Sequence, residues 1–515
     1  MKGVVAAGHP LTAEAGAQVL RQGGNAVDAA ICAVLTSFAV ESPLTGFGAG
    51  GFMMVHRGGE TTLIDFFVAA PGKDGLERGV ELAPVPVHFD ADTVQTFYVG
   101  PASCGVPGTA AGLELALRRF GSAPLADLAA PGIRLAREGA PVNAEQGYIL
   151  EILWPIHERL AETRELYAPG GRKLGEGDVF RFPELADALE RFAAEGAEPF
   201  YRGEVATALS RFMAEHGGTL GPTDLAAYEA LERRPIRAPF RGAEVLTNPP
   251  PSSGGILIAY SLGLLERLGE RSGPEQLVAA MGAANAARDE AFAEALYGDE
   301  LHAALLAPDV LDRVAAAVGG GPGSPPTAPG DLLGSTIHIS ALDGDGMCAS
   351  VTCSNGSGSG VFVPGTGVIL NNMLGEEDLN PLGFHAIAPG RRVPSMMAPT
   401  VVLRNGEIEL GLGSAGSNRI RSAILQTVVR AVEEGMSAGD AVRAPRLHFE
   451  QGVVQAEPGI DEQALARIEA SGVPVLRRPR INLFFGGVQA VTCDRTTGAL
   501  SGGGDPRRGG ATATA

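Results

Sequence analysis

Residues 334–355 read GSTIHISALDGDGMCASVTCSN, two strand-like runs that flank a glycine-rich turn at 343–346. This pattern predicts a β-hairpin. With the centre of the turn between residues 344 and 345, Thr336 is expected opposite Cys353 and beside Ser354. A hydroxyl at the start of one strand would therefore meet a hydroxyl at the end of its partner.

The segment just before this hairpin has a different composition. Residues 319–331, GGGPGSPPTAPGD, lack hydrophobic periodicity and predict an exposed, flexible linker in which a chain break would be tolerated. A break before Thr336 would release an α-amino group with a pKa of about 7.7–8.0, which is suited to take the proton of the threonine hydroxyl. The Thr-X-His-X-Ser pattern alone is also ordinary alternating β structure.

Helix-like and strand-like segments alternate through the rest of the chain. Residues 11–41 predict a helix capped by Thr12. Because Gly23, Gly24 and Asn25 interrupt its pattern, two shorter helices are the alternative. Hairpins are expected with turns at 58–59 and 405–406, and a glycine loop after Gly413 opens another helix. Further helices are expected near 110–137, 183–196, 203–216 and 255–318, and a loose tail at 502–515. This order of elements predicts an α+β fold.

Composition excludes several classes of function. The chain has 515 residues, 45% of them hydrophobic, and a formal net charge of −19, which disfavours nucleic acids and anionic membranes as partners. Neither a secretory signal nor an apolar run long enough to span a membrane is found. The five cysteines form no CxxC pair and the nine histidines no metal motif, so we expect reduced thiols, a cytoplasmic location and neither metal nor cofactor.

Several strings, in order along the chain, resemble the γ-glutamyltransferase family of N-terminal nucleophile hydrolases. Besides the hairpin at 334–355, they are GNAVDAA (24–30), GFGAGGFM (46–53), GVPGTAAG (105–112), NPPPSSGG (248–255), ILNNMLGEEDLNP (369–381), PSMMAPT (394–400), GSAGSNRI (413–420) and GGGDPRR (502–508). The resemblance covers nearly the whole chain. It implies a four-layer αββα sandwich and a precursor that cleaves itself.

The resemblance also implies catalytic roles. Cleavage would fall between Ser335 and Thr336, giving a large segment, 1–335, and a small one, 336–515, that stay together as subunits, with a higher homo-oligomer left open. Thr336 would be the nucleophile, and Ser354 matches a threonine that hydrogen-bonds its hydroxyl. Gly416 and Ser417 match the two residues whose backbone N–H groups bind the oxyanion. Amides at the start of a helix suit that role because they point at developing negative charge.

Substrate-binding roles follow from the same motifs. Asn355 resembles a residue that contacts the substrate, and Asp378, or else Glu377, resembles the acid that holds its α-amino group. Ser395 resembles a serine that binds the α-carboxylate. Met396 stands where the family has a second serine. The implied activity is cleavage of γ-glutamyl amides such as glutathione through an acyl-threonine ester, which water or an acceptor amine resolves.

Other departures from the family pattern leave the acyl group open. Phe67 and Val68 replace an Arg-Glu pair, and no arginine stands in register as the clamp for the glutamyl carboxylate, for which Lys73 and Arg78 are the nearby substitutes. A more apolar pocket favours, as an alternative, an acylase that cleaves a non-glutamyl amide. An unprocessed, inactive binding homologue is the third possibility. His338 braces the precursor's site or is a packed strand residue.

Overall fold

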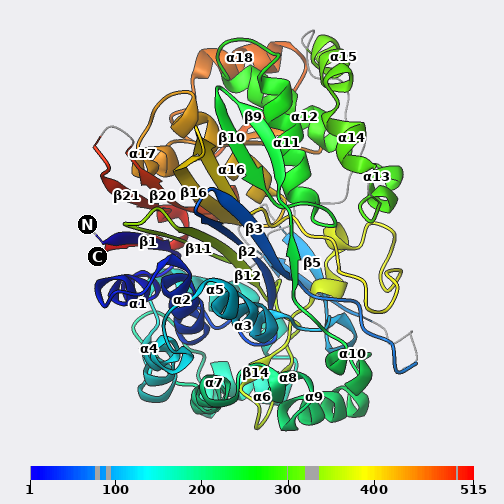
Figure 1. Ribbon diagram of the computed structural model, residues 1–515. Helices are drawn as coiled ribbons and strands as arrows, with labels where there is room; N and C mark the ends of the chain where they lie inside the picture. The colour runs from blue at the N-terminus through cyan, green and yellow to red at the C-terminus, as the bar shows by residue number, and fades with distance from the viewer. Residues whose placement is uncertain (1, 76–81, 89–93, 299, 319–335, 495–496) are drawn as a thin grey trace.

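Two stacked β-sheets lie between two layers of helices (Figure 1). The computed structural model describes residues 2–75, 82–88, 94–298, 300–318, 336–494 and 497–515. Strands of the first sheet contact strands of the second directly, and helices cover the outer face of each. The expected αββα sandwich is confirmed. Among the described residues no helix has the length and apolar character that crossing a bilayer requires.

The first sheet has seven strands and combines both segments of the chain. Its order is β22 (Ala511–Thr514), β1 (Gly3–Ala7), β11 (Ile337–Asp343), β12 (Cys348–Ser354), β2 (Gly50–Arg57), β3 (Glu60–Phe66) and β8 (Leu231–Arg233). In this sheet β1 lies between β22 and β11, and β12 pairs with β2, so strands from the two segments are hydrogen-bonded neighbours and the segments share one core. Every residue of β11 and β12 is buried.

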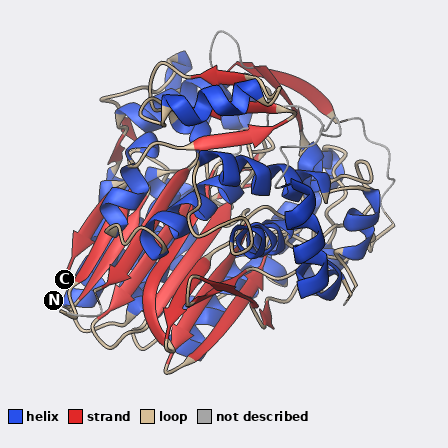
Figure 2. Cartoon of the chain, turned by 90° about the horizontal axis from the view of Figure 1, so that it is seen from above, coloured by secondary structure: helices blue, strands red, loops and turns tan. Residues whose placement is uncertain are grey.

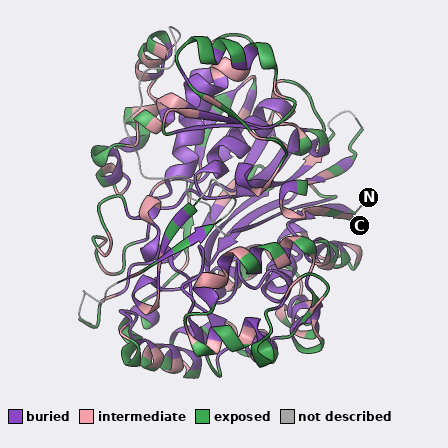
Figure 3. Cartoon of the chain, turned by 180° about the vertical axis from the view of Figure 1, so that it is seen from behind, coloured by how far each residue is buried: buried purple, intermediate pink, exposed green. Residues whose placement is uncertain are grey.

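The second sheet packs on the inner face of the first. Its order is β21 (Leu500–Gly504), β20 (Gly487–Cys493), β16 (Glu407–Ala415), β15 (Thr400–Arg404), β10 (Ala243–Thr247) and β9 (Ile236–Phe240). Figure 2 shows the strands from above, with the helices around them. Burial follows the layers, because exposed residues concentrate on the outer helices (Figure 3). Small two- and three-stranded sheets lie outside this core: β4 (Ala83–His88) with β5 (Val94–Val99), β6 (Ala140–Pro141) with β7 (Val179–Phe180), β13 (Phe362–Val363) with β14 (Val368–Ile369), and β17 (Leu447–Glu450) with β18 (Val453–Ala456) and β19 (Val475–Arg477).

Apolar helices cover the two sheets. Those near the first sheet are α1 (Pro10–Arg21), α2 (Ala26–Val40), α3 (Thr109–Phe120), α4 (Leu125–Glu138), α5 (Ala144–His157), α6 (Ala161–Tyr167), α7 (Pro183–Glu195), α8 (Glu198–Tyr201), α9 (Glu204–Glu215) and α10 (Pro222–Ala226). Those near the second sheet are α11 (Ser253–Leu265), α12 (Pro274–Ala286), α13 (Glu290–Ala295), α14 (Leu301–Leu306), α15 (Pro308–Val318), α16 (Arg419–Val432), α17 (Ala438–Arg443) and α18 (Glu462–Ala470). All residues of α2 are buried, which fits its almost uncharged sequence.

The sequence predicted two local turns correctly, but it placed the cap of the first helix at the wrong residue. The turns at 58–59 and 405–406 lie where expected, with positive φ at Gly58, Gly59, Asn405 and Gly406. The interruption at 23–25 does divide two helices. The cap of the first helix, however, is His9, whose Nδ1 accepts a hydrogen bond from the Leu11 amide.

The register of the central hairpin is one residue away from the prediction. Ile337, not Thr336, pairs with Cys353, because the turn is centred on Asp345. In that turn the carboxylate of Asp343 accepts hydrogen bonds from the amides of Asp345 and Met347. This side-chain capping adds a residue to the turn that the glycine pattern did not predict. The shift brings Thr336 level with Ser354.

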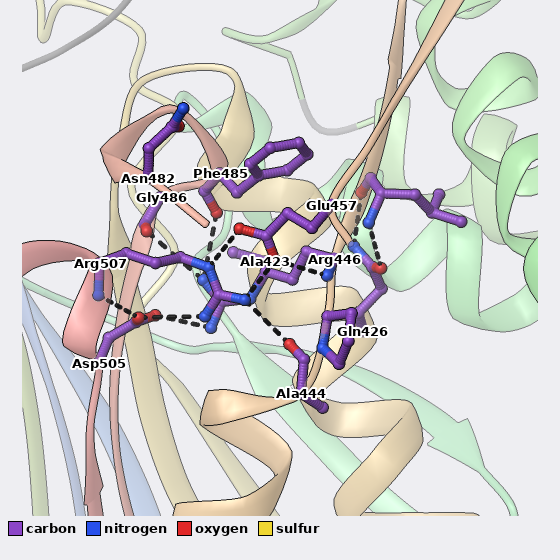
Figure 4. A network of polar contacts seen from close by, with 12 residues as sticks. Ala423, Gln426, Ala444, Arg446, Glu457, Asn482, Phe485, Gly486, Asp505 and Arg507 are labelled. Carbon is purple, nitrogen blue, oxygen red and sulfur yellow. Dashed lines mark hydrogen bonds and ion pairs between the residues drawn. The ribbon is translucent and has the colours of Figure 1, made fainter. Parts of the chain in front are cut away.

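The C-terminal tail is ordered, contrary to expectation. Its last strand, β22, pairs with β1, and Asp505 and Arg507 are fully buried. Arg507 pairs with Asp505 and Glu457, and Asp505 also pairs with Arg446 at 2.7 Å (Figure 4). Arg446 donates in turn to the carbonyl of Phe485 at 3.2 Å. Pairing and hydrogen bonding compensate the desolvation of these charges, so the tail is part of the core.

Candidate active site

Thr336 lies immediately before β11, with 6% of its surface exposed. Its hydroxyl donates a 3.2 Å hydrogen bond to Oγ of Ser354, the last residue of β12. The amide of Gly356 also donates to Ser354 Oγ, at 2.8 Å, which fixes that hydroxyl in place. Two adjacent antiparallel strands therefore bring Thr336 and Ser354 together, as the sequence indicated. Ser335 and the linker at 319–331 lie outside the described residues.

The loop between β16 and α16 presents backbone amides at the start of a helix. The N–H groups of Gly416 and Ser417 donate no hydrogen bond to any residue that the structure describes. Gly416 has φ of 126°, and a Cβ there would lie 2.8 Å from Cα of Gly486, so both the conformation and the close approach require glycine. Amides held in this way at a helix N-terminus can stabilise an oxyanion.

A small pocket joins these two elements. Thr336, Ser354, Ser395, Met396, Asp378 and Ser417 line it, together with residues that sequence analysis did not single out: Gly356, Met373, Glu376, Leu379, Met397 and Ile420. Phe67, one of the residues that replace the family's Arg-Glu pair, is also in the lining. The hydroxyl of Thr336 therefore faces a pocket whose walls are largely apolar and which contains two carboxyl groups.

Of Asp378 and Glu377, the structure places Asp378 in the lining of the pocket. Its Oδ2 accepts a 2.9 Å hydrogen bond from the hydroxyl of Ser417, whereas its buried Oδ1 accepts none from the described residues. Burial raises the pKa of Asp378, against the opposing effects of the Arg288 guanidinium and the Ser417 hydrogen bond. Glu377, the alternative, is not among the residues that line the pocket.

Glu376 is a second pocket acid that the sequence did not reveal. Its Oε1 accepts a 2.9 Å hydrogen bond from the Ser357 amide. Burial, followed by the charge of Asp378, raises the pKa of Glu376 to about 8. Two adjacent buried carboxyl groups resist ionising together, so Glu376 keeps its proton near neutral pH. The acidic run at 376–378 was the available signal, but three adjacent acids do not show which of them face inward.

Asn355 and Ser395 occupy different surroundings. Asn355 is fully buried, and neither side-chain oxygen nor nitrogen has a hydrogen-bond partner among the described residues. A buried amide without partners is costly, so this side chain suits a ligand contact. The hydroxyl of Ser395 lines the pocket and accepts a 3.1 Å hydrogen bond from the Met397 amide. The sulfur of Met396 accepts from the Ser253 hydroxyl at 3.3 Å.

Of the two cations considered as substitutes for the clamp, Lys73 does not line this pocket. Lys73 is exposed, its backbone amide donates to Asp224, and its side-chain stem lies against Gly390. Arg78 falls outside the described residues. Val68 is buried but does not line the pocket either. The prediction that Lys73 replaces the arginine clamp is therefore wrong, because the loop that carries Lys73 turns towards Asp224.

His338, two residues after Thr336, connects the two sheets. Its Nδ1 lies 2.8 Å from Thr352 Oγ1 and its Nε2 lies 3.0 Å from Ser340 Oγ. Ser340 donates in turn to the carbonyl of Gln489 in the second sheet, so Nε2 carries the proton that Ser340 accepts. Burial lowers the pKa of His338 to about 3, which keeps the ring neutral. His338 is a packed strand residue that also fixes the spacing of the sheets.

Comparisons with known proteins agree with this fold, which is that of an N-terminal nucleophile hydrolase. The family model for γ-glutamyltranspeptidase matches residues 12–515. Acylase ACY 1 proenzyme of Pseudomonas sp. (strain SE83) is 34% identical, over 97% of this chain and 91% of the relative. Glutathione hydrolase proenzyme of Escherichia coli (strain K12) is 32% identical, over 98% of this chain and 90% of the relative.

Solved structures give the same result. The cephalosporin acylase from Bacillus halodurans matches with a TM-score of 0.86 and 26% identity, over 100% of this chain and 96% of that one. Helicobacter pylori γ-glutamyltranspeptidase matches with a TM-score of 0.54 and 28% identity, over 62% of this chain and 91% of that one. The chain belongs to the γ-glutamyltranspeptidase family.

Proposed function

We propose that the protein cleaves itself before Thr336 and that the released threonine then hydrolyses or transfers γ-glutamyl amides. The observation that supports the chemistry is the hydroxyl of Thr336, held by Ser354 at the edge of the pocket. Self-cleavage would use the same oxygen to attack the Ser335 carbonyl. Relatives of this chain are named as proenzymes, which agrees with processing.

In the processed enzyme the α-amine of Thr336 takes the proton of its own hydroxyl as the oxygen attacks the substrate amide. Amides of Gly416 and Ser417 bind the resulting oxyanion, and the protonated amine then gives its proton to the leaving nitrogen. Water, or an acceptor amine such as a dipeptide, attacks the acyl-threonine ester and regenerates the enzyme. All five cysteines are free, and free thiols are typical of a reducing compartment. We therefore propose a cytoplasmic location.

The environment of Asp378 supports a γ-glutamyl group as the acyl part of the substrate. The buried Oδ1 of this carboxylate has no hydrogen-bond donor among the described residues, and the carboxyl of Glu376 lies in the same pocket. An ammonium group on the acyl chain would satisfy Oδ1. The α-amino group of a γ-glutamyl amide supplies such a cation.

A second candidate is an acylase with a different acyl group. Phe67, Met396, Met397 and Ile420 give the pocket apolar walls, which suit an acyl chain without charge. Both an acylase and a glutathione hydrolase are similar to this chain at comparable identity. Activity on acyl anilides that lack an amino group would favour this candidate.

Processing and activity are tested together. The purified protein is incubated, separated on a denaturing gel and sequenced from its N-terminus, and release of p-nitroaniline from γ-glutamyl-p-nitroanilide is measured. We expect a band of about 53 kDa to give two, the smaller beginning at Thr336, and activity to follow processing. Thr336→Ala should remain one inactive band, and Thr336→Ser should retain part of both properties.

Two results would contradict the proposal. Equal activity of the wild type and Thr336→Ala would exclude the nucleophile. A single band that persists in an inactive wild-type protein would instead support an unprocessed binding homologue.

A further inference from the structure

Phe67 is a wall residue of the pocket whose backbone is held at two atoms by side chains. It directly follows β3, is fully buried, and lines the same pocket as Thr336. Its amide donates a 3.0 Å hydrogen bond to Oδ1 of Asp65, and its carbonyl accepts one of 2.7 Å from the hydroxyl of Tyr228. Neither Asp65 nor Tyr228 is among the residues that line the pocket. The position of this wall therefore depends on two side chains that lie behind it.

Tyr228 is itself fixed by neighbouring groups. Tyr201, the last residue of α8, stacks on its ring with centroids 5.4 Å apart and an angle of 8° between the planes. The guanidinium carbon of Arg392 lies 4.5 Å from the centroid of the Tyr228 ring. A Cβ at Gly108 would lie 2.0 Å from the Tyr228 hydroxyl oxygen, so the chain approaches that oxygen closely. The hydroxyl therefore has little freedom to turn away from the Phe67 carbonyl.

Arg392 connects the two supports of Phe67. Besides its contact with the Tyr228 ring, its Nε donates a 3.2 Å hydrogen bond to Oδ1 of Asp65, the oxygen that accepts from the Phe67 amide. Asp65 is fully buried, and its Oδ2 accepts a 2.7 Å hydrogen bond from Arg233. Charge-assisted hydrogen bonds of this kind hold a buried carboxylate firmly. Asp65, Arg392 and Tyr228 thus form one connected frame behind the wall.

The two stacked tyrosines differ in what their hydroxyls hold. Tyr201 donates a 3.1 Å hydrogen bond to the carbonyl of Pro107, whereas Tyr228 donates to the pocket wall. Both rings are buried, and both line a separate cavity of about 570 Å³ between α3 and α8. Neither lines the pocket of Thr336. An acyl group in that pocket therefore touches neither tyrosine, and an effect of Tyr228 on it must pass through Phe67.

We propose that Tyr228 is a positioning residue that limits how long an acyl group the pocket accepts. This inference rests on the proposed function. The hydroxyl fixes the carbonyl of Phe67, and Phe67 bounds the space that an acyl group on Thr336 can occupy. A buried carbonyl that loses its donor is unfavourable where it stands, so the backbone of Phe67 can then move and the wall recedes. A receding wall admits additional methylene groups.

Substrates that differ only in chain length test this role. One series of p-nitroanilides keeps an α-amino acid group and adds one methylene at a time: β-aspartyl, γ-glutamyl and δ-aminoadipyl. A second series carries no charge: butyryl, hexanoyl and octanoyl. Each series is extended until the rate of the wild type declines. The quantity compared is the ratio of kcat/KM for the first disfavoured length to that for the preferred length.

Tyr201→Phe is the matched control for Tyr228→Phe. It removes the same hydroxyl from the other ring of the stacked pair. That hydroxyl donates to the Pro107 carbonyl and accepts from the Ala111 amide, and neither bond reaches the pocket. The control should therefore cost at least as much stability, which melting temperatures check. Processing of each variant is confirmed on a gel before kinetics.

We expect Tyr228→Phe to raise the ratio for the disfavoured length roughly 3- to 10-fold, the effect that one neutral hydrogen bond corresponds to. Tyr201→Phe should leave the ratio as in the wild type. Phe67→Ala should raise the ratio by itself, because it removes the wall side chain. In that background Tyr228→Phe should add little, since the group through which it acts is already absent.

The outcomes separate this inference from the function beneath it. An unchanged ratio in Tyr228→Phe, an equal loss at every chain length, or the same change in Tyr201→Phe overturns the positioning role while amide hydrolysis stands. A full effect of Tyr228→Phe in the Phe67→Ala background overturns the route through Phe67. Failure of the fully processed wild type to cleave any anilide of either series overturns the proposed function itself.

Discussion

The hydroxyl of Ser417 donates a 2.9 Å hydrogen bond to Oδ2 of Asp378, so one residue serves both halves of the site. Its backbone amide belongs to the proposed oxyanion loop, and its side chain orients the pocket carboxylate. The hydroxyl at this position therefore adds a contact that a glycine could not make.

Ser417→Gly should separate these two roles. The residue has φ of 50°, which glycine adopts readily, so the loop and its N–H should be retained. Loss of the hydroxyl should raise KM for the amine-bearing 4-aminobutyryl anilide about threefold to tenfold and leave kcat/KM for butyryl anilide unchanged. Steady-state kinetics on both substrates checks this, and an equal loss on the two would show that the loop itself had moved.

Gly413 should tolerate no side chain, because His338 fills the space opposite it. A Cβ at position 413 would lie 2.3 Å from Cε1 of the imidazole. We expect Gly413→Ala to lower the free energy of unfolding by about 1–3 kcal/mol, measured by chemical denaturation. Gly175→Ala, where a Cβ would meet open space, is the control. Additive effects of Gly413→Ala and His338→Ala in a double-mutant cycle would contradict direct contact.

The stability of the protein should depend on pH through Glu376. Its pKa is raised from 4.5 to about 8 by burial and then by Asp378, so between these values the folded state holds a proton that the unfolded chain releases. This contribution is fully present below pH 4.5 and is lost as the pH rises to 8. Glu376→Gln should therefore raise Tm relative to the wild type at pH 8 more than at pH 5. A difference in Tm that is constant across this range would refute the assignment.

The buried ion pairs of the tail should be essential for stability. Asp505→Asn would leave Arg446 and Arg507 without their shared carboxylate (Figure 4), at a cost of about 3–5 kcal/mol in the free energy of unfolding. Asp440→Asn, which removes an exposed pair with Arg443, should cost under about 1 kcal/mol. Urea denaturation of both variants provides the comparison. Similar small losses in the two would mean that the network contributes little.

The central hairpin shows which features of a fold a local sequence pattern can predict. Alternating residues and a glycine turn predicted two paired strands, which is correct, because strand formation and chain reversal depend on neighbours in sequence. The same pattern placed the register one residue away, since Asp343 caps the turn with its side chain. Thr12 looked like a helix cap, yet its hydroxyl is buried and bonds Glu41 on the next helix, a contact between distant residues.

The sequence by itself determined the fold class, the family and the turns at 58–59 and 405–406, because each follows from short motifs whose meaning does not depend on distant residues. Only the tertiary structure decided which of three adjacent acids line the pocket and that the tail is part of the core. These facts depend on how elements far apart in sequence pack together. Burial then sets the charges of the side chains, and no local pattern records that environment.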